Sequence, residues 1–92
     1  MEKLNRAIAR NIVSKAIAVD TSFKQLDIDA RLPLADLSLD LGAKTRIYKQ
    51  IVHDIEFVGY VPKFSATELF KAKTVGEVVN IVIAATESGG PE

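Results

Sequence analysis

The stretch DLSLDLGAKTRIYK, from Asp36 to Lys49, contains the junction that decides the fold of this chain. A segment rich in leucine and aspartate ends at the pair Leu41-Gly42, and helical periodicity begins directly after it. Isoleucines then recur every four residues, at Ile47, Ile51 and Ile55. An α-helix turns once in about 3.6 residues, so this spacing puts the isoleucines on one face. We therefore predict an amphipathic helix from Ala43 to about Phe57.

The residues before this junction are interpreted as one helix and one long connection. From Glu2 to Val19 the helical period appears again, and basic side chains fall mostly outside the apolar stripe, as on a solvated face. The stripe consists of Leu4, Ile8, Ile12 and Ala16, with Ala9, Val13 and Ile17 beside it. The polar run 20–22 ends the helix. The segment from Phe23 to Gly42 holds Pro33 and many leucines, which predicts a long connection packed across the core, with a short helical turn of its own.

The residues after the second helix carry stop and start signals. Gly59 and Pro62 prevent that helix from continuing. The pattern of a capping box then occurs twice, at Ser65 with Glu68 and at Thr74 with Glu77. We predict a short helix through Leu69 and Phe70, and a last helix from Val75 to about Thr86. The run VVNIVI in the last helix would also suit a strand, but the sequence offers no second strand to pair with it.

Composition limits the classes of function. The 92 residues suffice for one domain, and 48% apolar with 26% charged residues is typical of an ordinary globular protein. With 12 basic and 12 acidic side chains, the formal net charge is zero, so neither nucleic acid nor a membrane is the expected partner. The N-terminal segment has scattered charges, unlike a signal peptide or a membrane span, and we expect a cytoplasmic location.

Four amphipathic elements hide their apolar stripes most simply in an antiparallel bundle. The predicted fold is therefore all-α, a four-helix bundle with a long loop between the first and second helices and a short third helix. We expect it to occupy residues 1–87, with 88–92 as a flexible tail.

This order of elements resembles the acyl carrier protein family, which includes the carrier domains of polyketide and nonribosomal peptide assembly lines. Leu41-Gly42-Ala43 is similar to the Leu-Gly pair before the family's modified serine. Phe57 and Val61-Pro62 resemble its Phe-x-x-x-Ile-Pro, and LFKAKTVGEVVNIV resembles the segment that joins its third and fourth helices. The resemblance runs from about residue 4 to residue 84 and implies a carrier-like four-helix fold.

The resemblance also implies a site, at which this chain departs from the family. In carrier proteins an Asp-Ser-Leu motif follows the Leu-Gly pair, and its serine holds a 4'-phosphopantetheine arm at a helix N-terminus, where the dipole and free amides favour a phosphodiester. Alignment on Leu41-Gly42 places Lys44, Thr45 and Arg46 at these three positions.

Two hydroxyls remain as candidate attachment sites. Thr45 stands at the position of the family's serine, although its methyl group crowds the oxygen, and a plain capping role is the commoner one for such a residue. Ser38 is followed directly by leucine, as the family's serine is. A helix beginning there would have Gly42 in its second turn, at a cost of about 1 kcal/mol relative to alanine.

The surface and the remaining polar residues complete the sequence-based expectations. Carrier proteins usually present an acidic second helix, whereas Lys44, Arg46 and Lys49 would give this one a basic face for a protein partner. His53 has no nucleophile or carboxylate spaced to act with it, so we expect a surface residue and no enzyme. With no cysteine, and with aspartates that do not fit a calcium loop, no metal site is expected.

Three functions follow from these observations. The leading hypothesis is a carrier-like domain without a functional phosphopantetheine serine, acting through protein binding in or near a fatty-acid, polyketide or nonribosomal-peptide pathway. The first alternative is a working carrier for a specialised acyl or aminoacyl group, modified at Thr45 or Ser38 with 4'-phosphopantetheine. The second alternative is an unrelated small helical adaptor that uses its basic rows as a contact surface.

Overall fold

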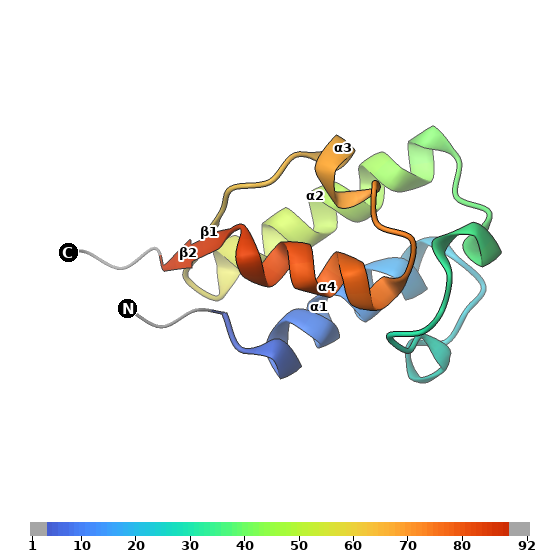
Figure 1. Cartoon of the computed structure of the whole chain (residues 1–92), viewed down its shortest axis with the longest axis horizontal. Coiled ribbons are helices and arrows are strands. Elements are labelled where there is room, and N and C mark those ends of the chain that lie inside the picture. Colours follow the sequence, from blue (N-terminus) through green and yellow to red (C-terminus); the bar gives the residue numbers. More distant parts are fainter. Residues whose placement is uncertain (1–3, 89–92) are drawn as a thin grey trace.

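The structure, a computed structural model, describes residues 4–88 and is mostly helical, with one short two-stranded ladder (Figure 1). Its α-helices are α1 (Arg6–Asp20), α2 (Leu41–Phe57), α3 (Ala66–Leu69) and α4 (Val75–Ala84). Two 3-10 helices, η1 (Gln25–Asp27) and η2 (Leu34–Leu37), lie in the connection between α1 and α2. The strands are β1 (Tyr60–Pro62) and β2 (Thr86–Ser88). The predicted helical class is confirmed, but the ladder was not predicted.

The first helix begins later than the sequence pattern suggested. The side chain of Asn5 accepts a hydrogen bond from the backbone N–H of Ala7 at 2.7 Å, so Asn5 is the N-cap and α1 starts at Arg6. The predicted start at Glu2 lies outside the described residues. The predicted stripe and the row beside it are buried at Ile12, Val13 and Ile17, but Ile8 is 43% exposed.

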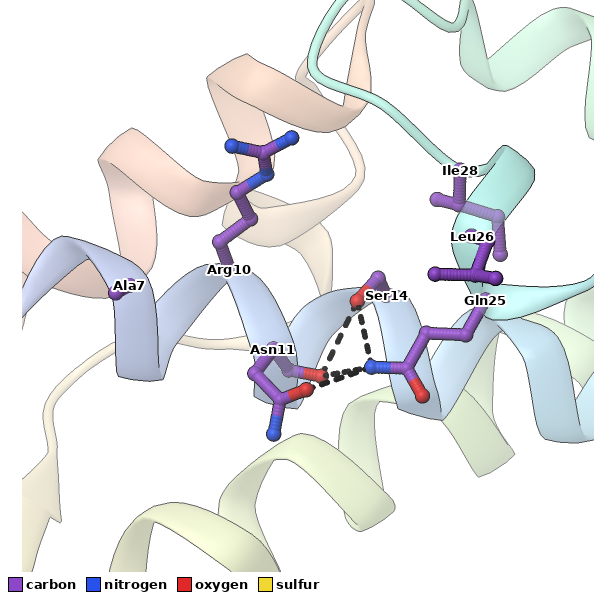
Figure 2. Close-up of a pocket in the computed structure, with 7 residues that line it drawn as sticks. All are labelled: Ala7, Arg10, Asn11, Ser14, Gln25, Leu26 and Ile28. Atoms are coloured by element: carbon purple, nitrogen blue, oxygen red, sulfur yellow. Dashed lines mark hydrogen bonds between the residues drawn. The ribbon is translucent and has the colours of Figure 1, made fainter.

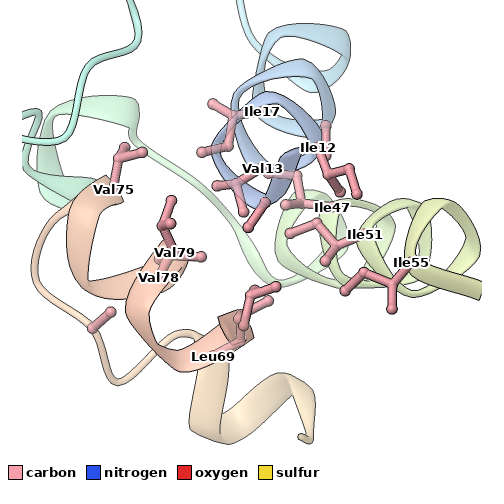
Figure 3. Close-up of a cluster of buried hydrophobic side chains, with 14 of the residues drawn as sticks. Ile12, Val13, Ile17, Ile47, Ile51, Ile55, Leu69, Val75, Val78 and Val79 are labelled. Atoms are coloured by element: carbon pink, nitrogen blue, oxygen red, sulfur yellow. The ribbon is translucent and has the colours of Figure 1, made fainter. Parts of the chain in front are cut away.

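The core lies where α1, α2 and α4 meet. Figure 3 shows isoleucines of α1 and α2 and valines of α4 pointing toward one another, with Leu69 of α3 at the side. The predicted stripe of α2 is confirmed, since Ile47, Ile51 and Ile55 are at most 1% exposed. Helix α1 packs against both α2 and α4, and α3 contacts α2 and α4. Burial of these side chains from three helices is the main force that holds the elements together.

The long connection is anchored to the start of α4 by its backbone. The N–H groups of Val75 and Gly76 donate to the carbonyls of Leu32 and Ala30 at 3.0 and 2.9 Å. In Figure 1 this connection wraps the end of the molecule opposite to the β1–β2 ladder. The prediction that it packs across the core with a short helical turn is confirmed for most of its length. Leu26, however, is almost fully exposed on η1.

The C-terminal half follows the predicted signals until α4 ends. Ser65 forms a capping box with Glu68, and the side chain of Thr74 accepts from the N–H of Glu77 as the N-cap of α4. Gly59, with φ of 91°, lies in the left-handed region just after α2, which confirms it as the stop. The last helix ends at Ala84 instead of Thr86, because the residues after it pair antiparallel with β1, Pro62 opposite Thr86. Of the predicted tail, residues 89–92 lie outside the described residues.

Candidate functional site

The amino end of α2 is the region to which the resemblance directs attention, and Asp40 caps it. The Asp40 carboxylate accepts a hydrogen bond from the N–H of Ala43 at 2.7 Å, and its carbonyl accepts from the N–H of Lys44 at 3.0 Å. The helix therefore begins at Leu41, two residues before the predicted start at Ala43. Leu41 and Gly42 belong to the first turn of the helix instead of the approach to it. An aspartate just before a periodic segment is a known start signal, so Asp40 could have been predicted as the N-cap from the sequence.

Thr45 is not at the end of the helix. It lies one turn inside α2, where its hydroxyl donates to the carbonyl of Leu41 at 2.9 Å. Such a bond from a threonine to the carbonyl four residues earlier is common within helices. The expectation that Thr45 is a capping residue at the helix end is wrong, because the carboxylate of Asp40 takes that role.

Ser38 lies before the helix, at a left-handed bend. Its backbone has φ of 51° and ψ of 46°, and it ends the 3-10 helix η2. Its side chain is exposed, and two residues separate it from the first residue of α2. Neither predicted hydroxyl therefore occupies the N-cap of α2.

Two hollows border this region on either side of a shared wall. The larger, of about 320 Å³, lies between the start of α2 and α3, and the smaller, of about 190 Å³, lies between α2 and the connection that contains η2. Lys44 and Phe70 line both hollows. Thr45 borders the larger hollow and Ser38 the smaller one, so the two hydroxyls open on different sides of the wall. The larger hollow also has Leu41, 81% exposed, and Lys71 at its edge.

The three basic residues of α2 do not share one face. Lys44 and Arg46 are two residues apart, which is about 200° around the helix axis. Lys44 lines the hollows beside α3, whereas Arg46 donates to the carboxylate of Asp20 at the end of α1. That hydrogen bond and the attraction of the same carboxylate raise the pKa of Arg46. Lys49 is exposed. The predicted basic face is therefore divided between two sides of the helix.

A further hollow, of about 490 Å³, lies between α1 and η1 (Figure 2). The amide nitrogen of Gln25 donates to the side-chain oxygen of Asn11 at 2.7 Å and to the hydroxyl of Ser14 at 3.2 Å. Figure 2 shows Arg10 pointing away from this cluster. The polar groups at its centre bond one another, so this hollow is a weaker candidate for a binding site than the hollows beside α2.

Other expected features can be placed in the described part of the chain. His53 is exposed on α2, as predicted. Within residues 4–88, no group of three or more histidines or carboxylates lies close enough together to hold a metal ion. None of the helices found there combines the length and the apolar character that a membrane crossing requires.

Comparisons with family models, curated proteins and solved structures find no match to this chain.

The cap can be tested by replacing Asp40 with alanine. Asp40→Ala removes the acceptor of the Ala43 N–H, so we expect the free energy of unfolding to fall by about 0.5–2 kcal/mol in a urea titration. Asp40→Ser keeps an acceptor and should cost much less. Asp36→Ala removes an exposed carboxylate from η2 and serves as the control. Equal effects at positions 36 and 40 would show that the carboxylate of Asp40 does not cap α2.

Proposed function

We propose that the chain is a carrier-protein-like helical bundle that acts by binding a protein partner, in or near a fatty-acid, polyketide or nonribosomal-peptide pathway, without a phosphopantetheine arm. The proposed role is binding, without an enzymatic activity of its own. The order and lengths of the helices and the long connection before α2 support the carrier-like part of it.

The capping of α2 by Asp40 is the observation that supports the absence of a phosphopantetheine arm. A phosphodiester at a helix N-terminus is stabilised by free backbone N–H groups and by the positive end of the dipole. Here the carboxylate of Asp40 already accepts from the N–H of Ala43 and places a negative charge at that end. A phosphate in the same place would lose a donor and meet a like charge.

The residues that line the two hollows beside α2 support the proposal that the partner is a protein. Leu41 exposes a large apolar side chain at the rim, and Phe70 contributes an aromatic surface. Lys44 and Lys71 add positive charge to the lining of the same hollow. A partner segment with one apolar side chain between acidic residues would fit this arrangement, because interfaces combine an apolar centre with complementary charges at the rim.

One observation favours the alternative of a working carrier modified at Ser38. The Ser38 side chain is exposed at a bend and borders a hollow, whereas the Thr45 hydroxyl is held by the carbonyl of Leu41. If an arm is attached to this chain, Ser38 is therefore the better of the two sites.

Intact-protein mass spectrometry distinguishes these functions. After incubation with coenzyme A and a broad-specificity phosphopantetheinyl transferase, we expect the mass to remain unchanged. An increase by one phosphopantetheine group would refute the proposal, and its loss in Ser38→Ala or Thr45→Ala would identify the site. The triple variant Lys44→Asp, Thr45→Ser, Arg46→Leu restores the Asp-Ser-Leu motif of carrier proteins. If a transferase modifies this variant, the result would support the carrier-like fold.

A further inference from the structure

The opposite end of α2 leaves an aromatic side chain in solvent. Phe57, the last residue of the helix, is 84% exposed, and its neighbour Val58 is 43% exposed. An isolated exposed apolar residue is normal, but here the first turns of α1 add Ile8, which is also 43% exposed. Three large apolar side chains, from α1 and from the C-terminal end of α2, therefore form one exposed group, and such groups mark contact surfaces more often than single residues do.

These side chains border a groove. The hollow between α1 and the end of α2 has a volume of about 180 Å³ and is lined by Ile8, Asn11, Ile12, Lys15, Asp54, Phe57 and Val58. Ile12 is buried at its floor, and Phe57 and Val58 stand at its edge. The groove therefore has an apolar floor at Ile12. Beside it stands Phe57, an exposed apolar side chain of the kind that could pack on such a floor.

The charges at the groove indicate what would occupy it. Lys15 on α1 and Asp54 on α2 are the charged residues in its lining, one of each sign. A symmetric pair joins the same surface on both copies, so that residue i of one contacts residue j of the other, and the reverse contact forms as well. Lys15 of each copy would then face Asp54 of the other, which gives two favourable pairs.

The net charge of the chain favours the same occupant. At a formal net charge of zero, two copies have no overall repulsion to overcome. A partner of strong single-sign charge would gain little from a lining with one lysine and one aspartate.

We propose that the chain forms a two-fold symmetric dimer in which Phe57 of each copy enters the groove of the other and Lys15 pairs with Asp54 across the axis. This surface is separate from the one proposed for the protein partner. Leu41 and Phe57 are sixteen residues apart on α2, which corresponds to about 24 Å along the helix. The dimer does not depend on the proposed function, and either can fail without the other.

Sedimentation equilibrium over a range of concentrations tests the aromatic contact. The unmodified sequence is expected to show a monomer–dimer equilibrium, and Phe57→Lys is expected to weaken it at least tenfold. Lysine suits the C-terminal turn of a helix, so this variant should fold, which circular dichroism can verify. Leu41→Asp replaces an equally exposed apolar residue at the other end of α2, where an acidic residue is favourable, and it should dimerise normally.

A charge exchange tests the symmetry. Lys15→Glu and Asp54→Lys should each weaken self-association, because each places like charges opposite one another. Mixed together, the two variants should form a heterodimer, since both cross-axis pairs are then of opposite sign. A monomer at every concentration would overturn the proposal, as would a dimer that is insensitive to Phe57→Lys or a mixture that does not associate more strongly than its components.

Discussion

Ile51→Ala is expected to lower the free energy of unfolding by about 2–5 kcal/mol, the largest stability effect that we predict for this chain. Ile51 is 0% exposed and lies in the middle of the α2 stripe, within the cluster that α1 and α4 complete. Truncation to alanine removes three carbon atoms from this cluster and leaves a cavity that the surrounding side chains can fill only in part. Urea denaturation followed by circular dichroism at 222 nm measures the change.

A graded series makes this prediction specific. Ile51→Val removes one carbon and should cost about 0.5–1.5 kcal/mol. Val19→Ala shortens a side chain that is mostly exposed on α1 and should stay within about 0.5 kcal/mol of the unmodified chain. If Ile51→Ala costs no more than Val19→Ala, then Ile51 is not in the core and the orientation of α2 is wrong.

The isoleucines of α2 show why its buried face could be predicted. They lie on three successive turns, and the neighbouring apolar row with Tyr48 and Val52 packs against the same core, so the buried side follows from the pattern alone. In α1 several adjacent rows are apolar. Ile8 and Val13 were both acceptable core positions by periodicity, and only packing against α4 as well as α2 decides that Val13 is fully buried whereas Ile8 stays 43% exposed.

The β1–β2 ladder could not be predicted for a related reason. Each strand has three residues, too few for a periodic signal, and Tyr60 pairs with Ser88 across 28 positions of sequence. The valine-rich run of α4 would also suit a strand by local propensity, although its capping box and apolar spacing predicted a helix. Thr74 caps that segment as a helix, and the face with Val75, Val78, Val79 and Val82 is buried against the core, so tertiary packing overrides the β-propensity of valine.

At the candidate site, the location was predicted but the local geometry was not. Leu41-Gly42 was correctly taken to mark the region where a buried helix begins, but the pair was predicted to precede that helix and instead forms its first two residues. The exact start depends on which polar side chain reaches a free N–H, and Asp40, Thr45 and Ser38 all stand within reach by sequence. Asp40 bonds the N–H of Ala43, and this one hydrogen bond brings Leu41 and Gly42 into the helix and leaves Thr45 one turn inside it.

Gly76→Ala is expected to destabilise the fold by about 1–3 kcal/mol, because the space beside Gly76 is occupied by backbone. A Cβ atom at this position would lie 2.9 Å from the carbonyl oxygen of Ala30 and 3.0 Å from its Cβ. The same carbonyl accepts the hydrogen bond of the Gly76 N–H, so moving it away also weakens the attachment of the long connection to α4. The measurement is again urea denaturation, with hydrogen exchange of the Val75 and Gly76 amides reporting on the attachment itself.

Gly42→Ala provides the matched comparison, since Gly42 and Gly76 are each the second residue of their helix. A Cβ at Gly42 would meet only the end of the Arg46 side chain at 3.3 Å and a carboxylate oxygen of Asp40 at 3.5 Å, and the Arg46 side chain can move. Alanine is the better helix former by up to about 1 kcal/mol, so this change should be neutral or stabilising. The intrinsic preference is the same at both sites, so the difference between the two variants isolates the contact with Ala30. If both substitutions stabilise the protein equally, the connection between α1 and α2 does not pack on α4. The segment that contains Ser38 would then not be held beside Lys44 and Phe70, and the smaller hollow between them would not form.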